Sequence, residues 1–249
     1  MSDEADRIFL ETTRRLAPAS LAMQDVRTAL SLLRPALGEG GRFADLGCGY
    51  GRHLAAIEAE GVRERIKGLR AALGVDRSAL LLAEAKKLAP RARLVRADLR
   101  ALPLRRGALD AAACFYSSMF LGSDEDARAA LAEAARVLRP GGRLVLTTDN
   151  PLRLAASPRA TFSQEVPGLG RLVEESAYDA ASGVDTVQRT LQRPGAPSLT
   201  ARWRIRYYHP LALWTLAEAA GLSQGRLEPD EPLTEETPQL TALFVRAGG

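Results

Sequence analysis

The stretch that decides the fold is Ala44-Asp45-Leu46-Gly47-Cys48-Gly49-Tyr50-Gly51-Arg52-His53. It starts as a short apolar strand, passes through three alternate glycines, and runs into a helical pattern that begins near His53. Glycines let the backbone approach a ligand closely, and the free N–H groups of a helix N-terminus can bind it. The sequence therefore predicts a nucleotide-type binding site at residues 44–53.

The glycine spacing excludes two common phosphate-binding patterns. The dinucleotide fingerprint is Gly-x-Gly-x-x-Gly, whereas Arg52 stands here where its third glycine would fall. A P-loop is excluded as well, because no Gly-Lys-Ser/Thr follows the turn.

Length and composition indicate a globular protein. With 249 residues, 46% of them hydrophobic, we expect one large domain, or one domain with a sizeable insertion. No apolar run reaches the roughly eighteen residues of a membrane span, and the N-terminus lacks the pattern of a signal peptide. The two cysteines, Cys48 and Cys114, are too few for a disulfide framework, so we expect a reduced, cytoplasmic protein.

The net charge of +4 comes from scattered arginines, and aromatic residues make up only 5% of the chain. A basic stripe with interleaved aromatics would indicate nucleic-acid binding, and none is present. We therefore expect no nucleic-acid partner.

Strand and helix patterns alternate along the first 150 residues. Apolar spacing at residues 4–37 predicts two amphipathic helices, broken near Pro18, that form an N-terminal helical cap over residues 1–41. Residues 62–70 read as an extended or second helix. Expected strands lie at 43–46, 72–76, 93–99, 109–115 and 143–148, and the expected helices between them at 54–61, 78–88 and 127–138. The alternation predicts an α/β fold with a doubly wound parallel sheet.

Two of the expected strands end in a carboxylate. Asp76 closes the second strand, where an acidic residue of a doubly wound sheet faces the ribose of a bound nucleotide. The alternative role of Asp76 is to cap the following helix. Asp98 closes the third strand, and it could likewise either act as a cap or bind a ligand.

Three motifs in this order resemble the class I S-adenosylmethionine (SAM) methyltransferases. They are Asp-x-Gly-x-Gly-x-Gly at 45–51, Gly-Val-Asp at 74–76 and Arg-Val-Leu-Arg-Pro-Gly-Gly-Arg-Leu-Val-Leu at 136–146. The resemblance covers residues 43–150 and implies a SAM-binding core at 42–150 with a Rossmann-like seven-stranded sheet and helices on both faces. A C-terminal helix and β-hairpin at 207–249 would complete the sheet.

The resemblance implies methyl transfer from SAM to an O, N or C atom of a small molecule, with S-adenosylhomocysteine as product. An RNA methyltransferase and a non-catalytic SAM-fold binding or regulatory subunit are the alternatives. No metal is expected, because neither His53 nor His209 has ligand spacing with Cys or a carboxylate. We expect a monomer or a homodimer.

The same resemblance implies a set of cofactor-binding residues. The glycine turn would offer backbone to the amino acid end, Asp76 would hold the ribose, Asp98 and Leu99 the adenine, and Phe115 would line the methionine arm. The set is Asp45, Gly47, Cys48, Gly49, Gly51, Asp76, Arg77, Asp98, Leu99 and Phe115.

Residues 151–206 depart from the minimal core. Strand patterns at 172–178 and 184–191 join around a hairpin signal, and a third at 200–207 alternates apolar and arginine-rich faces. This predicts a small antiparallel β insertion after strand five, which is a candidate substrate lid, or else a dimerisation or packing element. The arginine face could meet an anionic substrate or RNA, or be solvated.

Acceptor contacts are expected beyond the carboxyl ends of the strands. The candidate substrate residues are Tyr116, Ser117, Asn150, Trp203, Tyr207 and Tyr208. His53, Tyr207 and His209 are candidate bases, although His53 could simply pack at the helix start. Tyr116-Ser117-Ser118 departs from the Asn-Pro-Pro-Tyr/Phe motif of the N-methyltransferases that act on planar amines in nucleic acids or proteins, which disfavours methylation of DNA bases.

Overall fold

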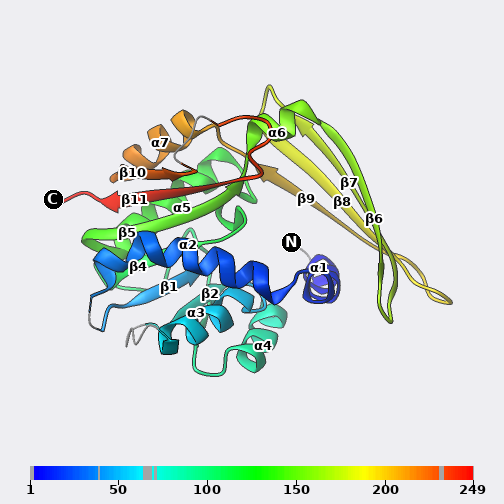
Figure 1. The fold of residues 1–249 in the computed structure, drawn as a ribbon, viewed down its shortest axis with the longest axis horizontal. Coiled ribbons are helices and arrows are strands. Elements are labelled where there is room, and N and C mark those ends of the chain that lie inside the picture. Colours follow the sequence, from blue (N-terminus) through cyan, green and yellow to red (C-terminus); the bar gives the residue numbers. More distant parts are fainter. Residues whose placement is uncertain (1–2, 39, 64–68, 70–71, 230–232, 249) are drawn as a thin grey trace.

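The computed structural model describes residues 3–38, 40–63, 69, 72–229 and 233–248. Two sheets organise them, and the second sheet stands beside the carboxyl ends of the central strands (Figure 1). The central, seven-stranded sheet has the order β10-β11-β5-β4-β1-β2-β3. Its strands are β1 (Phe43–Leu46), β2 (Leu73–Asp76), β3 (Arg93–Arg96), β4 (Leu109–Cys114), β5 (Leu138–Asp149), β10 (Leu222–Glu228) and β11 (Gln239–Arg246).

The pairing within the central sheet confirms the predicted fold. The strands β3, β2, β1, β4 and β5 are parallel to one another, and β11 is antiparallel to both β5 and β10. The order reverses at β1, which places the glycine turn after β1 at the point where ligands bind in open α/β sheets.

Helices cover both faces of this sheet, as expected. One face packs against α2 (Ala19–Leu37), α3 (Arg52–Arg63) and α4 (Ala79–Leu88), and the other against α5 (Asp124–Val137) and α7 (Pro210–Ala219). Alternate residues of β4 divide between the two cores: Ala111 and Ala113 face α2 and α3, whereas Ala112 and Cys114 face α5. The sheet is therefore buried on both sides, which explains why its strands are apolar runs.

The N-terminal region forms the two predicted helices. The first, α1 (Asp3–Leu16), ends just before Pro18, and α2 begins after it. The two helices pack differently: α2 lies on the central sheet, whereas Ala5 and Ile8 of α1 pack with Ala201 of the second sheet. The N-terminal helix thus joins the core to the insertion. The helix expected at 62–70 falls largely outside the described residues, with α3 reaching Arg63.

The insertion forms a four-stranded antiparallel sheet in the order β6-β7-β8-β9. Its elements are α6 (Pro151–Ala156), β6 (Arg159–Val166), β7 (Gly170–Asp179), β8 (Val184–Gln192) and β9 (Leu199–Arg206). The three expected strands are β7 to β9, and β6 adds a fourth that the sequence prediction missed. All of β6 except Val166 is exposed, so this edge strand lacks the apolar alternation that marks a half-buried strand.

The division of the chain into segments 1–41, 42–150, 151–206 and 207–249 stays a prediction. The first and third of these segments pack against each other through α1 and the second sheet. Within the described residues no helix is long and apolar enough to span a membrane.

Candidate active site

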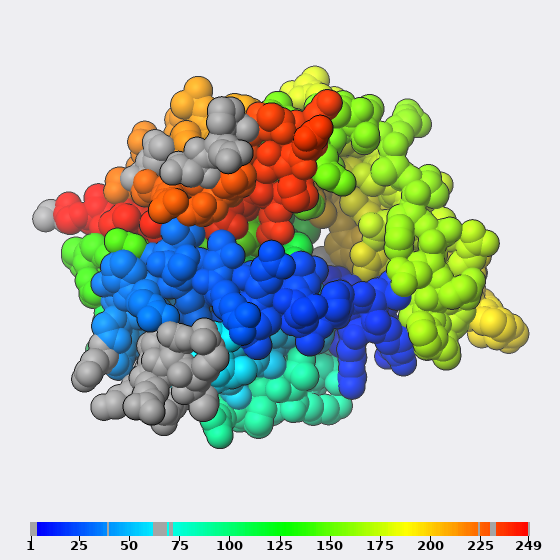
Figure 2. All heavy atoms as spheres, in the orientation of Figure 1, coloured from blue at the N-terminus to red at the C-terminus, as the bar shows by residue number. Residues whose placement is uncertain are grey.

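A cavity of about 570 Å³ lies between the carboxyl ends of the central strands, α1 and the second sheet. Figure 2 shows an opening where the N-terminal segment, the C-terminal segment and the second sheet approach one another. The volume is in the range of small-molecule sites, roughly 300–1,000 Å³. Its lining comes from the glycine turn on one side and from β7, β8 and β9 on the other.

The glycine turn places backbone directly at the cavity. Gly47, Gly49 and Gly51 have φ values of 80°, 54° and 86°, a region that favours glycine. A Cβ on Gly47 would lie 2.6 Å from Ser118 Cβ, whereas a Cβ on Gly51 would meet Ala85. Gly47 and Gly49 line the cavity. The third glycine instead allows the turn to pack against α4.

Asp76 lies at the end of β2, beside this turn. Its Oδ2 accepts the Gly49 N–H at 2.9 Å, and its Oδ1 accepts the Ser78 N–H at 2.8 Å. Burial raises the pKa of this carboxyl, although both backbone bonds favour its ionised form. The helix that follows is capped by Ser78, whose hydroxyl accepts the Leu81 N–H. Asp76 therefore faces the cavity without capping that helix.

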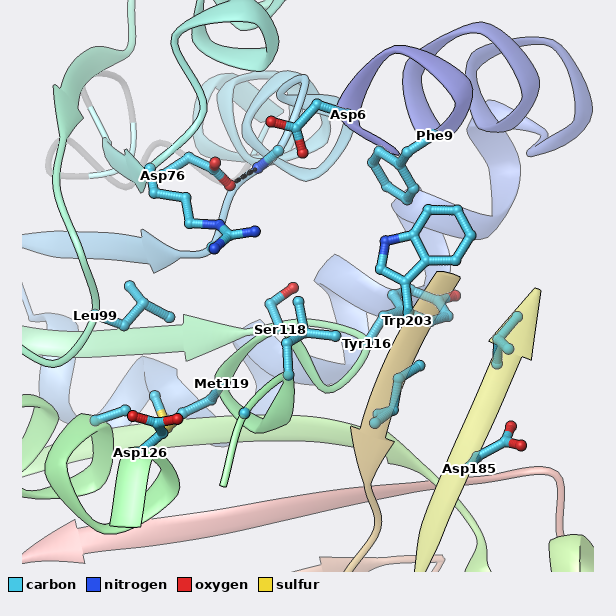
Figure 3. Close-up of a pocket in the computed structure, with 18 of the residues that line it drawn as sticks. Asp6, Phe9, Asp76, Leu99, Tyr116, Ser118, Met119, Asp126, Asp185 and Trp203 are labelled. Atoms are coloured by element: carbon cyan, nitrogen blue, oxygen red, sulfur yellow. Dashed lines mark hydrogen bonds between the residues drawn. The ribbon is translucent and has the colours of Figure 1, made fainter. Parts of the chain in front are cut away.

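The third strand brings Asp98 and Leu99 to the same cavity. Hydrogen bonds from Arg100 hold the pKa of Asp98 below its usual range, with Arg100 Nη2 at 2.7 Å from Oδ2. Arg77 and Leu99 also line this end. Figure 3 shows Leu99 and Asp76 on the same side of the cavity.

The end of β4 supplies the floor. Tyr116 and Ser117 both have left-handed backbone, with φ of 54° and 55°, which turns the chain sharply into the short 3-10 helix η2 (Ser118–Phe120). Tyr116, Ser118 and Met119 line the cavity. The Ser117 hydroxyl instead donates to Thr148 Oγ1 at 2.8 Å and is buried.

His53 is a buried neighbour of this floor. Its ring stacks on Phe115 at 4.1 Å, and its Nε2 lies 3.2 Å from Asp25 Oδ2. Burial lowers the pKa of His53 against the opposing effect of Asp25. The Tyr116 hydroxyl donates to the same Asp25 oxygen at 2.9 Å. Because His53 does not line the cavity, its place favours the packing interpretation.

The second sheet and α1 enclose the far end. The Tyr207 hydroxyl donates to Asp149 Oδ2 at 3.1 Å, and both residues line the cavity. The Trp203 side chain points toward Phe9 of α1 in Figure 3. Sequence reasoning missed several of the lining residues, namely Asp6, Phe9, Ser118, Met119, Asp126, Asp149, Glu174, Asp185 and Arg189.

Several residues that the sequence predicted for the site do not line the cavity. Asp45 and Cys48 are buried beneath the turn, and Phe115 packs on His53. The Asn150 side chain caps α6 and donates to the carbonyls of Thr234 and Thr237. The remaining such residues are Gly51, His53, Ser117, Tyr208 and His209.

Tyr208 and His209 do not line the cavity, and each has a different environment. The Tyr208 hydroxyl donates to Asp124 Oδ1 at 2.7 Å, and its ring packs edge-on against Phe120. His209 is exposed at the N-terminus of α7. Among the sequence-predicted acceptor residues, the structure therefore brings Tyr116, Trp203 and Tyr207 to the cavity.

Comparisons with known proteins find similarity to methyltransferases. Residues 44–146 match the family model described as a methyltransferase domain. A malonyl-[acyl-carrier protein] O-methyltransferase of Enterobacter lignolyticus is 31% identical over 166 residues, covering 64% of this chain and 61% of the relative. The chain spans less than two thirds of the length of the curated relatives it matches.

Solved structures share the whole fold. The CcbJ methyltransferase of Streptomyces caelestis is 17% identical with a TM-score of 0.77, covering 99% of this chain and 100% of that one. CalS10, an amino pentose methyltransferase of Micromonospora echinaspora, is 20% identical with a TM-score of 0.63, covering 91% and 92%. Residues 44–146 thus match the methyltransferase-domain model, and the sheet order and glycine turn give the chain the same fold as these methyltransferase structures.

Proposed function

We propose that this protein transfers a methyl group from SAM to a small-molecule acceptor. The observation that carries the proposal is a single cavity that reaches from the glycine turn and Asp76 to Trp203 and Tyr207 of the second sheet. A donor held at one end and an acceptor held at the other would meet inside it.

The residues at the turn fit SAM. Each Asp76 oxygen accepts one backbone hydrogen bond, so each keeps a lone pair for a ribose hydroxyl. Gly47 and Gly49 present backbone without side chains, and Leu99 offers an apolar surface for a base. When bound, the cofactor supplies an activated methyl group, so the work of the protein is alignment and exclusion of water.

The second sheet and α1 support the lid interpretation of residues 151–206. Trp203 and Ile205 of β9 line the cavity, and Arg189 of β8 donates hydrogen bonds to the Thr12 and Thr13 hydroxyls of α1 at 3.0 and 3.2 Å. We infer that these two elements close over the acceptor and hold it against the donor.

A small acceptor is favoured over RNA. The cavity wall carries several carboxylates, which repel phosphate, whereas Arg202 and Arg204 point to the exposed face of β9. The intact glycine turn, with Asp76 and Asp98 both at the cavity, disfavours a non-catalytic regulatory subunit. We further expect a cytoplasmic monomer or homodimer, in keeping with two buried free thiols.

Calorimetry with S-adenosylhomocysteine tests this proposal. We expect micromolar-scale binding by the wild type, on the order of −8 kcal/mol. Asp76→Ala should weaken it by about 1.5–3 kcal/mol, because charge-assisted hydrogen bonds are lost. Glu125→Ala, which removes an exposed carboxylate from α5, should leave the affinity unchanged. Absence of binding by the wild type, or equal affinities for wild type and Asp76→Ala, would defeat the proposal.

A further inference from the structure

Three carboxylates from different strands line the second-sheet end of the cavity. They are Asp149 at the end of β5, Glu174 on β7 and Asp185 on β8. Burial raises the pKa of Asp149, and Asp185 and Glu174 raise it further. Burial likewise raises the pKa of Asp185, with Glu174 adding to the effect. Their negative charges therefore repel one another inside the cavity wall.

The nearby cations do not neutralise all three. Arg189 Nε donates to Glu174 Oε2 at 2.7 Å, so this guanidinium is paired with Glu174. The side-chain partners of the other two carboxylates are neutral hydroxyls, and Asp185 also accepts a hydrogen bond from the backbone of Ala177. Tyr207 donates to Asp149, and Ser176 donates to Asp185, with its Oγ 2.8 Å from each carboxylate oxygen. Arg153 of α6 favours the ionised form of Asp149 through its charge alone.

A fourth carboxylate, Asp6, closes the cavity from α1. Its side chain is 6% exposed, and its Oδ1 has no hydrogen-bond partner within the described part of the chain. Figure 3 shows Asp6 on the opposite side of the cavity from Asp185. A buried carboxylate oxygen without a partner is costly, and a bound donor or cation would satisfy it. Asp6 lies at the Asp76 end of the cavity, where its charge raises the pKa of Asp76, so it adds negative charge on the side opposite Asp185.

The same end has an apolar wall. Val187 lies opposite both Ser176 and Trp203 in the sheet, and Ile205 lies opposite Asp185. Val187, Trp203 and Ile205 line the cavity, so an organic group can pack beside the carboxylates. Within the described residues, no group of three His, Cys, Asp or Glu side chains is arranged to hold a metal ion.

From this arrangement we propose that the acceptor is an amine, which binds as an organic ammonium ion with its positive charge between Asp149 and Asp185. The proposal rests on the methyltransferase function argued above and names the substrate class of the same site. A carboxylate or phosphate ester would be repelled by the same wall. A neutral alcohol would leave the repulsion between the two aspartates in place.

Asp149 can also act as the base when the acceptor is an amine. Alkyl amines are protonated at neutral pH, and the protonated nitrogen has no lone pair. One ammonium N–H bond breaks, its proton moves to the Asp149 carboxylate, and the electron pair stays on nitrogen. That pair forms the bond to the methyl carbon while the carbon–sulfur bond breaks and its electron pair returns to sulfur. The product is a methylammonium ion, and Asp149 returns its proton to water.

The test uses cyclohexylamine, cyclohexanol and cyclohexanecarboxylate as matched probes. Each is titrated calorimetrically into the 249-residue protein, with and without saturating S-adenosylhomocysteine. We expect cyclohexylamine to bind about tenfold to hundredfold tighter than cyclohexanol, as charge-assisted hydrogen bonds predict. Asp149→Asn and Asp185→Asn should each reduce this preference by about tenfold. Neither variant should change the affinity for S-adenosylhomocysteine, which also reports that the variant is folded.

The matched control is Glu175→Gln, which makes the same carboxylate-to-amide change on the exposed face of β7 and should keep the preference. Equal binding of amine and alcohol, tighter binding of the carboxylate, or no binding of the amine up to about 10 mM would overturn the inference. An amine preference in a protein that does not bind S-adenosylhomocysteine would support the inference and defeat the methyltransferase proposal. Binding of S-adenosylhomocysteine without an amine preference would do the reverse.

Discussion

Asp45, beneath the glycine turn, should make the stability of this protein depend on pH. Its side chain is 1% exposed, and neither oxygen has a hydrogen-bond partner in the described residues. Burial raises its pKa to about 8, with repulsion from Asp76 adding to the effect and Arg52 opposing it. In the unfolded chain the pKa is about 3.9. Between these values the folded state keeps a proton that the unfolded state has lost.

The sign of the effect follows from this raised pKa. The contribution of Asp45 to stability is complete below pH about 4 and is lost as the pH rises toward 8, at about 1.4 kcal/mol per pH unit. Asp45→Asn removes the titration. The unfolding free energy of the variant minus that of the wild type should therefore rise by about 2–3 kcal/mol between pH 5 and pH 7.

Urea unfolding followed by circular dichroism at constant ionic strength measures this difference. Asp110→Asn is the control, because hydrogen bonds from Arg42 and Arg139 overcome the effect of burial and lower the pKa of Asp110 to about 2. Its difference from wild type should stay constant from pH 5 to pH 7. A constant difference for Asp45→Asn as well would refute the reasoning, since it would mean that Asp45 is ionised in the folded protein.

Three further predictions concern packing. Gly51→Ala should lower the unfolding free energy by about 2–4 kcal/mol in urea, against about 1 kcal/mol for Gly168→Ala, because both have positive φ but only the first Cβ clashes. Equal losses would contradict this. Ile8→Ala should cost about 2–4 kcal/mol, since Ile8 is fully buried against the second sheet; a loss under about 0.5 kcal/mol would contradict that packing. Arg189→Met should release α1 and speed tryptic cleavage after Arg14 or Arg15, and an unchanged rate would show that the Thr12 and Thr13 contacts do not hold the helix.

The central sheet was predictable because its signals are local. Short apolar runs ended by glycines or carboxylates placed β1 at its observed residues and β2 within one residue of them. The same local signals placed Gly47, Gly49 and Asp76 at strand ends, and the structure brings all three to one cavity, where their cofactor role stays a prediction. In contrast, the exposed edge strand β6 has almost no buried side chain to give it a pattern.

The end of the cavity beside the second sheet was harder to predict because tertiary packing assembles it. Asp6 and Asp185 are far apart in sequence, and only the contact of α1 with the second sheet brings both to one cavity. The sequence did contain one usable signal. Asp185, Val187 and Arg189 alternate along β8, so the three side chains could have been assigned to one face of the sheet, the face they share with Trp203 of β9. The sequence prediction named Asn150, whereas the structure places the preceding residue, Asp149, at the cavity and uses Asn150 to cap α6.

A crystal structure with S-adenosylhomocysteine tests the central claim most directly. We predict that the ribose hydroxyls lie within hydrogen-bond distance of both Asp76 oxygens, that the adenine lies against Leu99, and that the sulfur faces the end of the cavity lined by Asp149 and Trp203. Density for the product outside this cavity, or a ribose without contact to Asp76, would contradict the claim.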